Sequence, residues 1–416
     1  MITPATTVHT ADELARAVRD ASRCRIAVGG SIEDVPPLRL APGQALFGED
    51  GRARIAFQAG ADGVMLTSDN EIRGLELLTS PDRRAILNDT MAAGLGCLRL
   101  ADLVVTGQVQ ILARDAVRSG HVEVDGLHIA AADARARPER PQGYGVRVVQ
   151  GAFTLWNMQE DASVTITADL AGLSAGRLDA PVLGSGIFVG GAGDVGGRLL
   201  ATRLETGAIY SDARIAPGTA DLISGGVFAV HGAHVDFVRN HGPVTTFGPN
   251  DMVLDNWGLV DRWIAKAKIT SYGPSGIGFV NFGTVNELKV EAPIETFGRG
   301  ARGFNVYTGT VRSAEFDRIV TRGDGAVGIQ ISQPVGRLVV RRGIETFGAT
   351  GDSLVKGVVV KLSAVGLSIK PGGVANEIDI EGGVTAHGDG IAPIEMHGQV
   401  GALRIRGGIN AAVPGT

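Results

Sequence analysis

The sequence has few of the residues that build disulfide scaffolds, aromatic cores or nucleic-acid surfaces. Aromatic residues make up 5% of its 416 positions, and it contains only two cysteines. The net charge of −5 is small, and no run of lysine and arginine occurs anywhere in the chain. Because clustered positive charge is the electrostatic footprint of nucleic-acid binding, we expect no DNA or RNA partner.

Long hydrophobic runs are missing as well. No stretch approaches the roughly 20 consecutive apolar residues that span a bilayer, and the first residues do not resemble a secretory signal peptide. Cys24 and Cys97 each begin a short apolar run, so we expect two reduced thiols in the core and no disulfide. These features predict no membrane partner and slightly favour the cytoplasm, while leaving open whether a signal peptide was removed.

Glycine, by contrast, is abundant. The 61 glycines and 17 prolines, together with 44% hydrophobic residues, describe many short strands broken by tight turns. Single globular cores stop growing at roughly 250–300 residues. A repeat architecture escapes this limit because each repeat packs only against its neighbours.

An internal repeat decides the fold class. Residues 244–248 (VTTFG), 294–298 (IETFG) and 344–348 (IETFG) are nearly identical, and related strings at 269–273 and 319–323 lie halfway between them. The period is therefore 25 residues, which suits three short strands and their turns. Stacked repeats would pair each strand with its counterpart about 4.8 Å away. We predict an all-β protein, a right-handed parallel β-helix that forms a solenoid of 25-residue coils.

The same pattern predicts one β-helix domain over residues 1–416. Thr10 and Glu13 have the spacing of a capping box, and Leu14 with Val18 forms an apolar stripe, so a helix is expected at 10–22. This helix would cover the open edge of the first coil. Residues 134–143 are expected to leave the solenoid as a loop, and residues 349–373 to form a coil with an insertion.

A capped helix that leads into the apolar run at 24–28, followed by glycine-rich coils over nearly the whole chain, resembles the pectin-lyase-like right-handed β-helix superfamily. The resemblance implies enzymes that act on acidic or neutral polysaccharides: lyases, hydrolases, epimerases and fructan transferases. The superfamily also includes tail-spike and adhesin-like structural proteins. The chain has no Asp-Asp pair, Gly-His-Gly or Arg-x-Lys motif of that superfamily's enzymes. No catalytic residue is therefore carried over.

Side chains one period apart should stack in columns, and alternation along a strand assigns them to a face. Phe279 and Phe304 belong to a predicted inward column, and Asn256 with Asn281 forms a predicted inward amide ladder. The outward face is predicted to have a flat floor of glycine (Gly278, Gly303 and Gly328), bordered by aromatic and polar columns.

The outward aromatic column consists of Trp257, Phe282 and Tyr307. Aromatic rings stack on the C–H faces of sugars, and amides bind their hydroxyls, so Asn305 and Gln330 in the adjacent column complete a predicted saccharide groove. Two alternatives stay open for the aromatic stripe: an oligomer interface, or burial under the protein's own long loops.

Charged residues supply the remaining candidate groups of this groove. Arg299 and Arg302 enter at its edge and suit a carboxylate or sulfate group. Sugar chemistry needs two carboxyl groups, and Asp255 and Asp251 are the candidate catalytic pair, with Asp255 on the strand beside Trp257.

The sequence thus predicts a carbohydrate-active enzyme, a hydrolase, lyase, transferase or epimerase, that processes a poly- or oligosaccharide along the β-helix. The alternative is a non-catalytic solenoid that binds glycans or serves as a spike-like structural unit. We expect no cofactor. We also expect no metal, because His231, His234 and His241 fit no zinc spacing. A homo-oligomer, either dimer or trimer, is left open.

Overall fold

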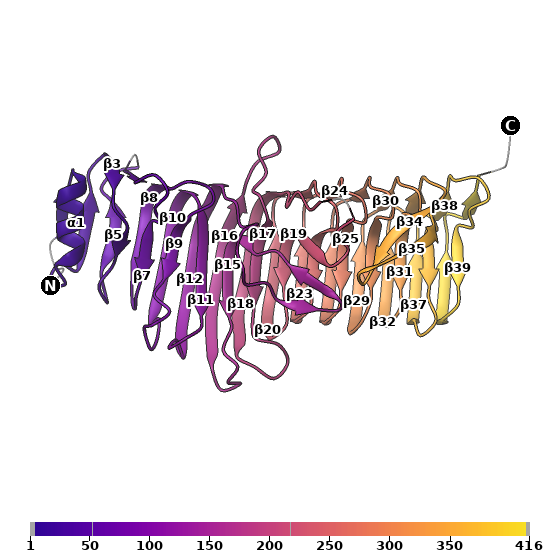
Figure 1. The fold of residues 1–416 in the computed structure, drawn as a ribbon. Coiled ribbons are helices and arrows are strands. Elements are labelled where there is room, and N and C mark those ends of the chain that lie inside the picture. The colour runs from indigo at the N-terminus through magenta and orange to yellow at the C-terminus, as the bar shows by residue number, and fades with distance from the viewer. Residues whose placement is uncertain (1–4, 52, 217, 413–416) are drawn as a thin grey trace. The chain divides into compact units, whose positions relative to one another are not determined.

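The computed structural model describes residues 5–51, 53–216 and 218–412. The chain divides into two compact units, Met1–Ala136 with Gln150–Thr206 and Val230–His234, and Arg137–Val149 with Gly207–Ala229 and Val235–Thr416. Most strands of each unit pair in parallel (Figure 1). The predicted single domain is not tested by this division and stays a prediction.

The first unit begins with β1 and the helix α1 (Ala11–Arg19). Thr10 caps α1, since its side chain accepts a hydrogen bond from the Glu13 amide, and the Glu13 carboxylate accepts one from the His9 amide. The helix buries Leu14 and Val18 against the first strands, as the apolar stripe predicts, and it ends at Arg19, short of the predicted residue 22.

The strands of the first unit pair in parallel in two series, one running through β2, β5, β8, β10, β12 and β16 and the other through β4, β7, β9, β11, β15 and β17. Two further strands, β18 (Arg198–Ser211) and β20 (Ala233–Asn240), have residues in both units. The strand bounds are β1 (Thr6–Val8), β2 (Arg25–Val28), β3 (Ser31–Val35), β4 (Leu38–Arg39), β5 (Ala45–Gly48), β6 (Arg54–Phe57), β7 (Val64–Leu66), β8 (Glu71–Leu78), β9 (Arg84–Asn88), β10 (Cys97–Thr106), β11 (Gln108–Ala113), β12 (Ser119–Ala131), β15 (Gly151–Asn157), β16 (Thr165–Ala175) and β17 (Ser185–Gly190).

The second unit has three parallel series. The first is β21 (Val244–Thr246), β24 (Ile269–Ser271), β27 (Ile294–Thr296), β30 (Ile319–Thr321), β33 (Ile344–Thr346), β38 (Val384–Ala386) and β41 (Ile409–Ala411). The second is β19 (Leu222–Ala229), β22 (Asp251–Asn256), β25 (Ile277–Asn281), β28 (Arg302–Val306), β31 (Val327–Ile331), β36 (Leu367–Ile369) and β39 (Ile394–Met396). The third is β23 (Leu259–Ala265), β26 (Thr284–Val290), β29 (Thr310–Phe316), β32 (Pro334–Val340), β37 (Val374–Ile380) and β40 (Gln399–Ile405).

Two segments of the second unit depart from these series. Residues 137–149 contain β13 (Gln142–Gly143) and β14 (Val146–Val148), which pair antiparallel, and β14 also joins β19. Within the predicted insertion at 349–373, β34 (Thr350–Val355) and β35 (Val358–Ser363) form an antiparallel hairpin. Its two-residue turn, Lys356 and Gly357, has positive φ at both positions, as type I′ hairpin turns require.

The 25-residue repeat determines the strand register in the second unit. Ile269 pairs with Ile294, and Ile294 with Ile319. Side chains one period apart stack, as the repeat predicts: the rings of Phe247 and Tyr272 stack at 5.4 Å, and those of Tyr272 and Phe297 at 5.0 Å. The protein is therefore all-β with long parallel sheets, which is compatible with a parallel β-helix.

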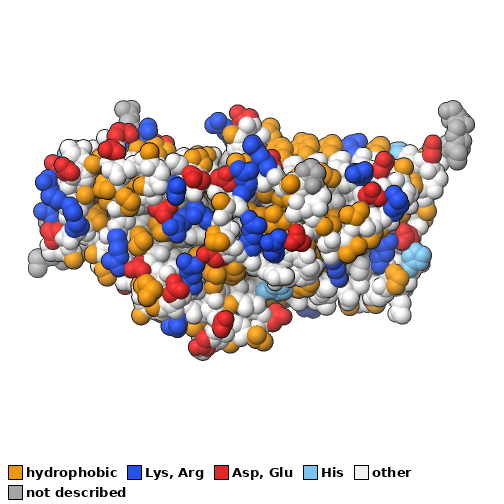
Figure 2. Space-filling view, viewed as in Figure 1, with side chains coloured by type: hydrophobic (Ala, Val, Ile, Leu, Met, Phe, Trp, Pro, Cys, Tyr) orange, Lys and Arg blue, Asp and Glu red, His pale blue; other side chains and the backbone are white. Residues whose placement is uncertain are grey.

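Figure 2 shows hydrophobic side chains along the edge on which β24 and β30 lie. Tyr272 and Phe297 of the stacked column are 46% and 36% exposed. Arg322 continues the column, with its guanidinium group 5.8 Å from the Phe297 ring centre and 4.7 Å from that of Phe347. Because these rings stack on each other, they present mainly their edges to solvent.

The core of the second unit follows the predicted inward columns. The Phe279 ring packs on Trp263 and Phe304, and both phenylalanines are fully buried. The Asn256 side chain donates a hydrogen bond to Asn281 Oδ1 at 2.9 Å, so the predicted amide ladder is present.

The predicted glycine floor is wrong, because these glycines face the core. A Cβ at Gly278 would lie 2.3 Å from Cγ2 of the buried Ile294, and one at Gly303 would lie 2.3 Å from Cγ2 of Ile319. Strand pairing also skips this position, since Met252 pairs with Ile277 and the next pair is Leu254 with Phe279. A local irregularity of this kind breaks the strict alternation on which the prediction depended.

The sequence predicts that the two cysteines are reduced thiols in the core, and the structure differs in how deeply they are buried. Both cysteines are free, as predicted, but Cys24 is exposed and Cys97 is only partly buried, so neither is a core residue. Among the described residues, no helix is long and apolar enough to cross a membrane.

Candidate functional site

The predicted aromatic stripe lies in the second unit beneath residues of the same chain. Trp257, Phe282 and Tyr307 are 3%, 7% and 5% exposed. The ring of Tyr144, from the 137–149 segment, stacks on Phe282 at 4.3 Å and meets Trp257 edge-on at 5.2 Å. Of the alternatives left open by the sequence, the structure thus places this stripe under a loop and not along an open groove.

The β34–β35 hairpin covers the next part of the same face. Arg302 is fully buried, and its guanidinium group donates to Ser353 Oγ at 2.7 Å and to the Leu354 carbonyl at 3.2 Å. Its Nε also approaches Gln330 Oε1 at 3.4 Å. Arg302 therefore holds the hairpin, and its guanidinium group is committed within the protein.

The two candidate catalytic carboxyl groups are also buried. Asp251 accepts hydrogen bonds from the Ser224 hydroxyl and from the Gly248 amide at 2.7 Å. Burial raises the pKa of Asp251 well above its usual range, the two hydrogen bonds oppose this shift, and the charge of Asp212 adds to it. Asp251 is thus protonated over a wider pH range than a carboxyl group in water.

Asp255 is completely buried, and neither of its carboxyl oxygens accepts a hydrogen bond of good geometry. Burial raises its pKa well above the usual range, and the adjacent Trp257 side chain opposes the shift only in part. Asn305, two repeats further along the same column, is equally buried, and its amide nitrogen and oxygen also lack hydrogen bonds. The structure does not place an open carboxyl pair on this face.

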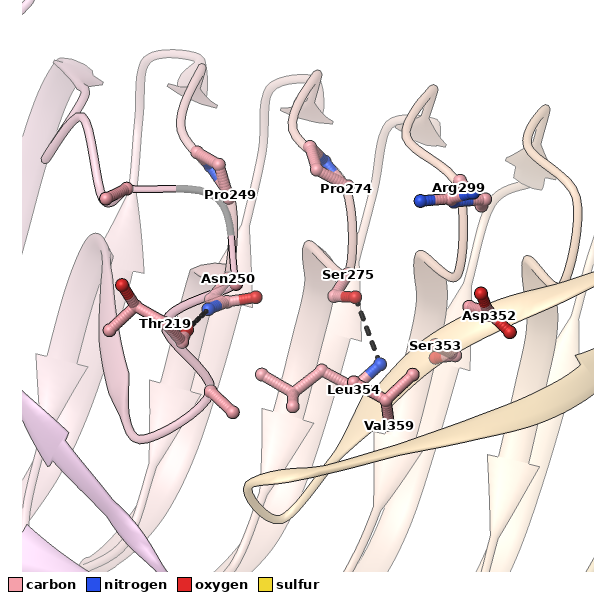
Figure 3. Close-up of a pocket in the computed structure, with 13 residues that line it drawn as sticks. Thr219, Pro249, Asn250, Pro274, Ser275, Arg299, Asp352, Ser353, Leu354 and Val359 are labelled. Carbon is pink, nitrogen blue, oxygen red and sulfur yellow. Dashed lines mark hydrogen bonds between the residues drawn. The ribbon is translucent and has the colours of Figure 1, made fainter.

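Arg299, another predicted site residue, lines an open pocket. Its pocket, of about 270 Å³, lies between consecutive turns of the second unit and the β34–β35 hairpin (Figure 3). Pro249, Pro274 and Arg299 occupy equivalent places on three successive turns, and Leu354 and Val359 approach from the hairpin.

The turns that line this pocket share one backbone conformation. Asn250, Ser275 and Gly300 have φ of 58°, 58° and 68°, the left-handed region that glycine and asparagine adopt most readily. Glycines two residues earlier let successive turns stack closely, since a Cβ at Gly273 would lie 1.7 Å from the Gly248 carbonyl oxygen. The repeat thus brings one side chain per turn to the same edge.

Two hydrogen bonds fix the pocket walls. Ser275 Oγ accepts from the Leu354 amide at 3.0 Å and ties the hairpin to the central turn. The Asn250 amide donates to the Thr219 carbonyl at 2.7 Å and holds the loop at the pocket's end. Both bonds are marked in the drawing of the pocket (Figure 3).

Two charged side chains line the pocket, Asp352 and Arg299, and they differ in whether the protein already pairs them. Asp352 forms an ion pair with Lys361 at 3.0 Å. Arg299 is exposed, and within the described ranges its side chain has no hydrogen bond or ion pair, while its backbone carbonyl accepts from the Ser275 amide at 2.8 Å. Its guanidinium group extends along the row of turns toward Pro274 (Figure 3). The pocket therefore offers one available cation beside apolar proline and leucine surfaces.

The first unit has an open cavity of its own, of about 530 Å³, on the outward face of β10, β12 and β16. Glu123 and Asp169 are register partners there. Glu123 pairs with Arg99 at 2.7 Å, and Asp169 pairs with Arg203 at 2.5 Å. The hydrogen bond from Arg99 holds the pKa of Glu123 low. Burial opposes the same shift at Asp169, whose pKa is lowered by hydrogen bonds from Thr202 and Arg203. Glu123 and Asp169 are thus each neutralised by an arginine.

Comparison with protein-family models, curated proteins and solved structures finds no match to this chain. The pocket residues that sequence reasoning missed are Asn250, Ser275, Asp352 and Leu354. The 25-residue spacing of Pro249, Pro274 and Arg299 would have indicated that one edge carries these turns. Nothing in the sequence indicated that the hairpin closes the other side.

Proposed function

We propose that the chain is a right-handed parallel β-helix of 25-residue coils, of pectin-lyase-like architecture, and that it binds a saccharide without processing it. The binding site is the pocket at Arg299. This is the non-catalytic alternative of the sequence prediction. The registers at 25-residue intervals in the second unit support the architecture.

The observation that carries this function is the exposed, unpaired guanidinium group of Arg299 at the edge of a preformed pocket. Guanidinium groups bind carboxylate and sulfate in a two-pronged geometry. The flat apolar surfaces of Pro249 and Pro274 suit the C–H face of a sugar ring, while the Asp352 carboxylate can accept from its hydroxyls. A pocket of about 270 Å³ suits a ligand of one or two rings.

Binding is favoured over catalysis because the candidate carboxyl groups are closed to solvent. Asp251 and Asp255 are 1% and 0% exposed, and the only carboxylate that lines the pocket within the described residues is Asp352. Two carboxyl groups at suitable separation are needed to hydrolyse a glycosidic bond by the usual routes.

A binding and turnover screen tests the proposal. Oligogalacturonates, sulfated galactans and neutral glucans are titrated by calorimetry, and the same mixtures are assayed for reducing ends and unsaturated products. We expect heat of binding with acidic saccharides and no product. Formation of product would instead support the enzymatic alternative, and the absence of binding to every saccharide would contradict the proposal.

A further inference from the structure

Two buried polar side chains of the second unit lack hydrogen-bond partners. Asp255 and Asn305 are both 0% exposed, and none of their side-chain oxygen or nitrogen atoms has a hydrogen bond of good geometry. Each lies beside the side chain two residues further on, Trp257 or Tyr307, without bonding it well. Buried polar groups are hydrogen-bonded in the great majority of proteins, so two orphans in one column call for a partner.

These two residues share one outward column, with Val280 between them. Asp255 pairs in register with Val280, and Val280 with Asn305. The aromatic stripe formed by Trp257, Phe282 and Tyr307 runs beside this column. A protonated carboxyl group and a carboxamide can each donate and accept a hydrogen bond.

The cover over this face is the 137–149 segment, and Tyr144 is its residue on the aromatic stripe. Tyr144 holds it through ring contacts with Phe282 and Trp257, and its hydroxyl reaches the Phe282 carbonyl only at 3.4 Å. The tip of the segment meets the hairpin turn, where a Cβ at Gly145 would lie 3.1 Å from the Lys356 carbonyl oxygen. The segment is anchored at its other end, where β14 pairs with β19 and Arg147 forms an ion pair with Asp221 at 2.8 Å.

We propose that the column of Asp255, Val280 and Asn305 is a closed binding site for one uncharged, polyhydroxylated ring, a neutral sugar unit, and that displacement of Tyr144 opens it. Hydroxyl groups of the sugar replace the missing partners of Asp255 and Asn305. The Phe282 face that Tyr144 vacates receives the C–H face of the ring. A charged ligand is disfavoured because Arg302, the buried cation on this face, is already held by the hairpin. The site is separate from the Arg299 pocket, and either can fail without the other.

Thiol labelling tests whether the cover opens. Val280→Cys places a thiol in the column, and Val306→Cys places one on the neighbouring inward face; both are made with Cys24→Ser and Cys97→Ser. Val280 and Val306 are both fully buried. We expect the thiol at position 280 to react at least 100-fold faster under native conditions, because opening of the cover does not require unfolding. Equal rates at the two positions would overturn the proposal.

Tyr144→Ala should increase labelling at position 280 at least tenfold and leave position 306 unchanged. Cellohexaose or xylohexaose at millimolar concentration should then slow labelling at 280 at least threefold. Failure of both sugars to slow it, or protection by hexagalacturonate alone, would overturn the assignment of an uncharged ligand.

Fluorescence quenching tests the opening of the cover without cysteine variants, in case those variants do not fold. Tyr144→Ala in the otherwise unchanged chain should increase acrylamide quenching of tryptophan fluorescence, and Trp257→Phe should abolish the increase. Unchanged quenching would contradict the opening of the cover at Tyr144. If binding at Arg299 fails while cellohexaose still protects position 280, only the proposed function is lost.

Discussion

The buried guanidinium group of Arg302 donates a hydrogen bond to the Ser353 hydroxyl at 2.7 Å, and this hydroxyl in turn donates to the Gly300 carbonyl at 2.7 Å. A single serine of the inserted hairpin thus connects a charged residue of one strand to the turn before it. The hairpin is attached to the parallel sheets through polar contacts between its own residues, which lie outside the repeat, and residues of the repeat.

Ser353→Ala should lower the free energy of unfolding by about 2 kcal/mol, because hydrogen bonds to buried charged groups contribute roughly 1.5–3 kcal/mol. Urea denaturation measures the change. Thr350→Ala is the matched control, since its hydroxyl meets the Ser363 hydroxyl on the exposed part of the same hairpin and should cost little. Equal effects of the two variants would show that Arg302 does not depend on Ser353.

Asp255→Asn should change the pH dependence of stability. The pKa of Asp255 is raised in the folded state, so its contribution to stability is fully present below the unfolded pKa of about 3.9 and is lost as pH rises through the folded pKa. Asparagine cannot ionise, so it removes this loss.

The variant should therefore melt at a higher temperature than the parent protein at pH 8 and lose that advantage at pH 3.5. Melting curves across this range check the difference between the two proteins, in which the effects of all other carboxyl groups cancel. A constant difference at every pH would mean that Asp255 does not titrate as its burial requires.

Phe304→Ala should destabilise the protein by about 3–5 kcal/mol, because a large buried ring leaves a cavity. The ring is fully buried and packs on Phe279 and Phe316. Ser332→Ala, outside the core, should be nearly silent. Similar shifts in melting temperature for both would contradict the assignment of faces.

Much of the second unit could be predicted because its period is regular. A 25-residue repeat fixes which residues stack, so the Phe247–Tyr272–Phe297 column and the Asn256–Asn281 ladder follow from counting. The face of Gly278 could not be predicted, because a local irregularity in pairing turns this position inward and leaves no trace in the period.

The candidate site was harder to predict because the covering segments are not periodic. Trp257, one residue after β22, and Arg302 of β28 lie where the repeat places them. Tyr144 and Ser353 come from excursions whose path depends on tertiary contacts. Whether an outward column is a groove or a buried face is decided by these excursions. The exposed position is instead that of Arg299, whose turn the hairpin contacts at Gly300 while it leaves the Arg299 side chain exposed.

The affinity of acidic saccharides for Arg299→Ala tests the central claim most directly. Oligogalacturonate and sulfated galactan are titrated separately by calorimetry into the parent protein, Arg299→Ala and Arg312→Ala, the last removing an exposed arginine that does not line the pocket. Loss of one charge-assisted contact, about 1.5–3 kcal/mol, corresponds to roughly 10–100-fold weaker binding. We predict that loss in Arg299→Ala for the saccharide that binds, with Arg312→Ala unchanged. Equal affinity in all three proteins would contradict a saccharide site at Arg299.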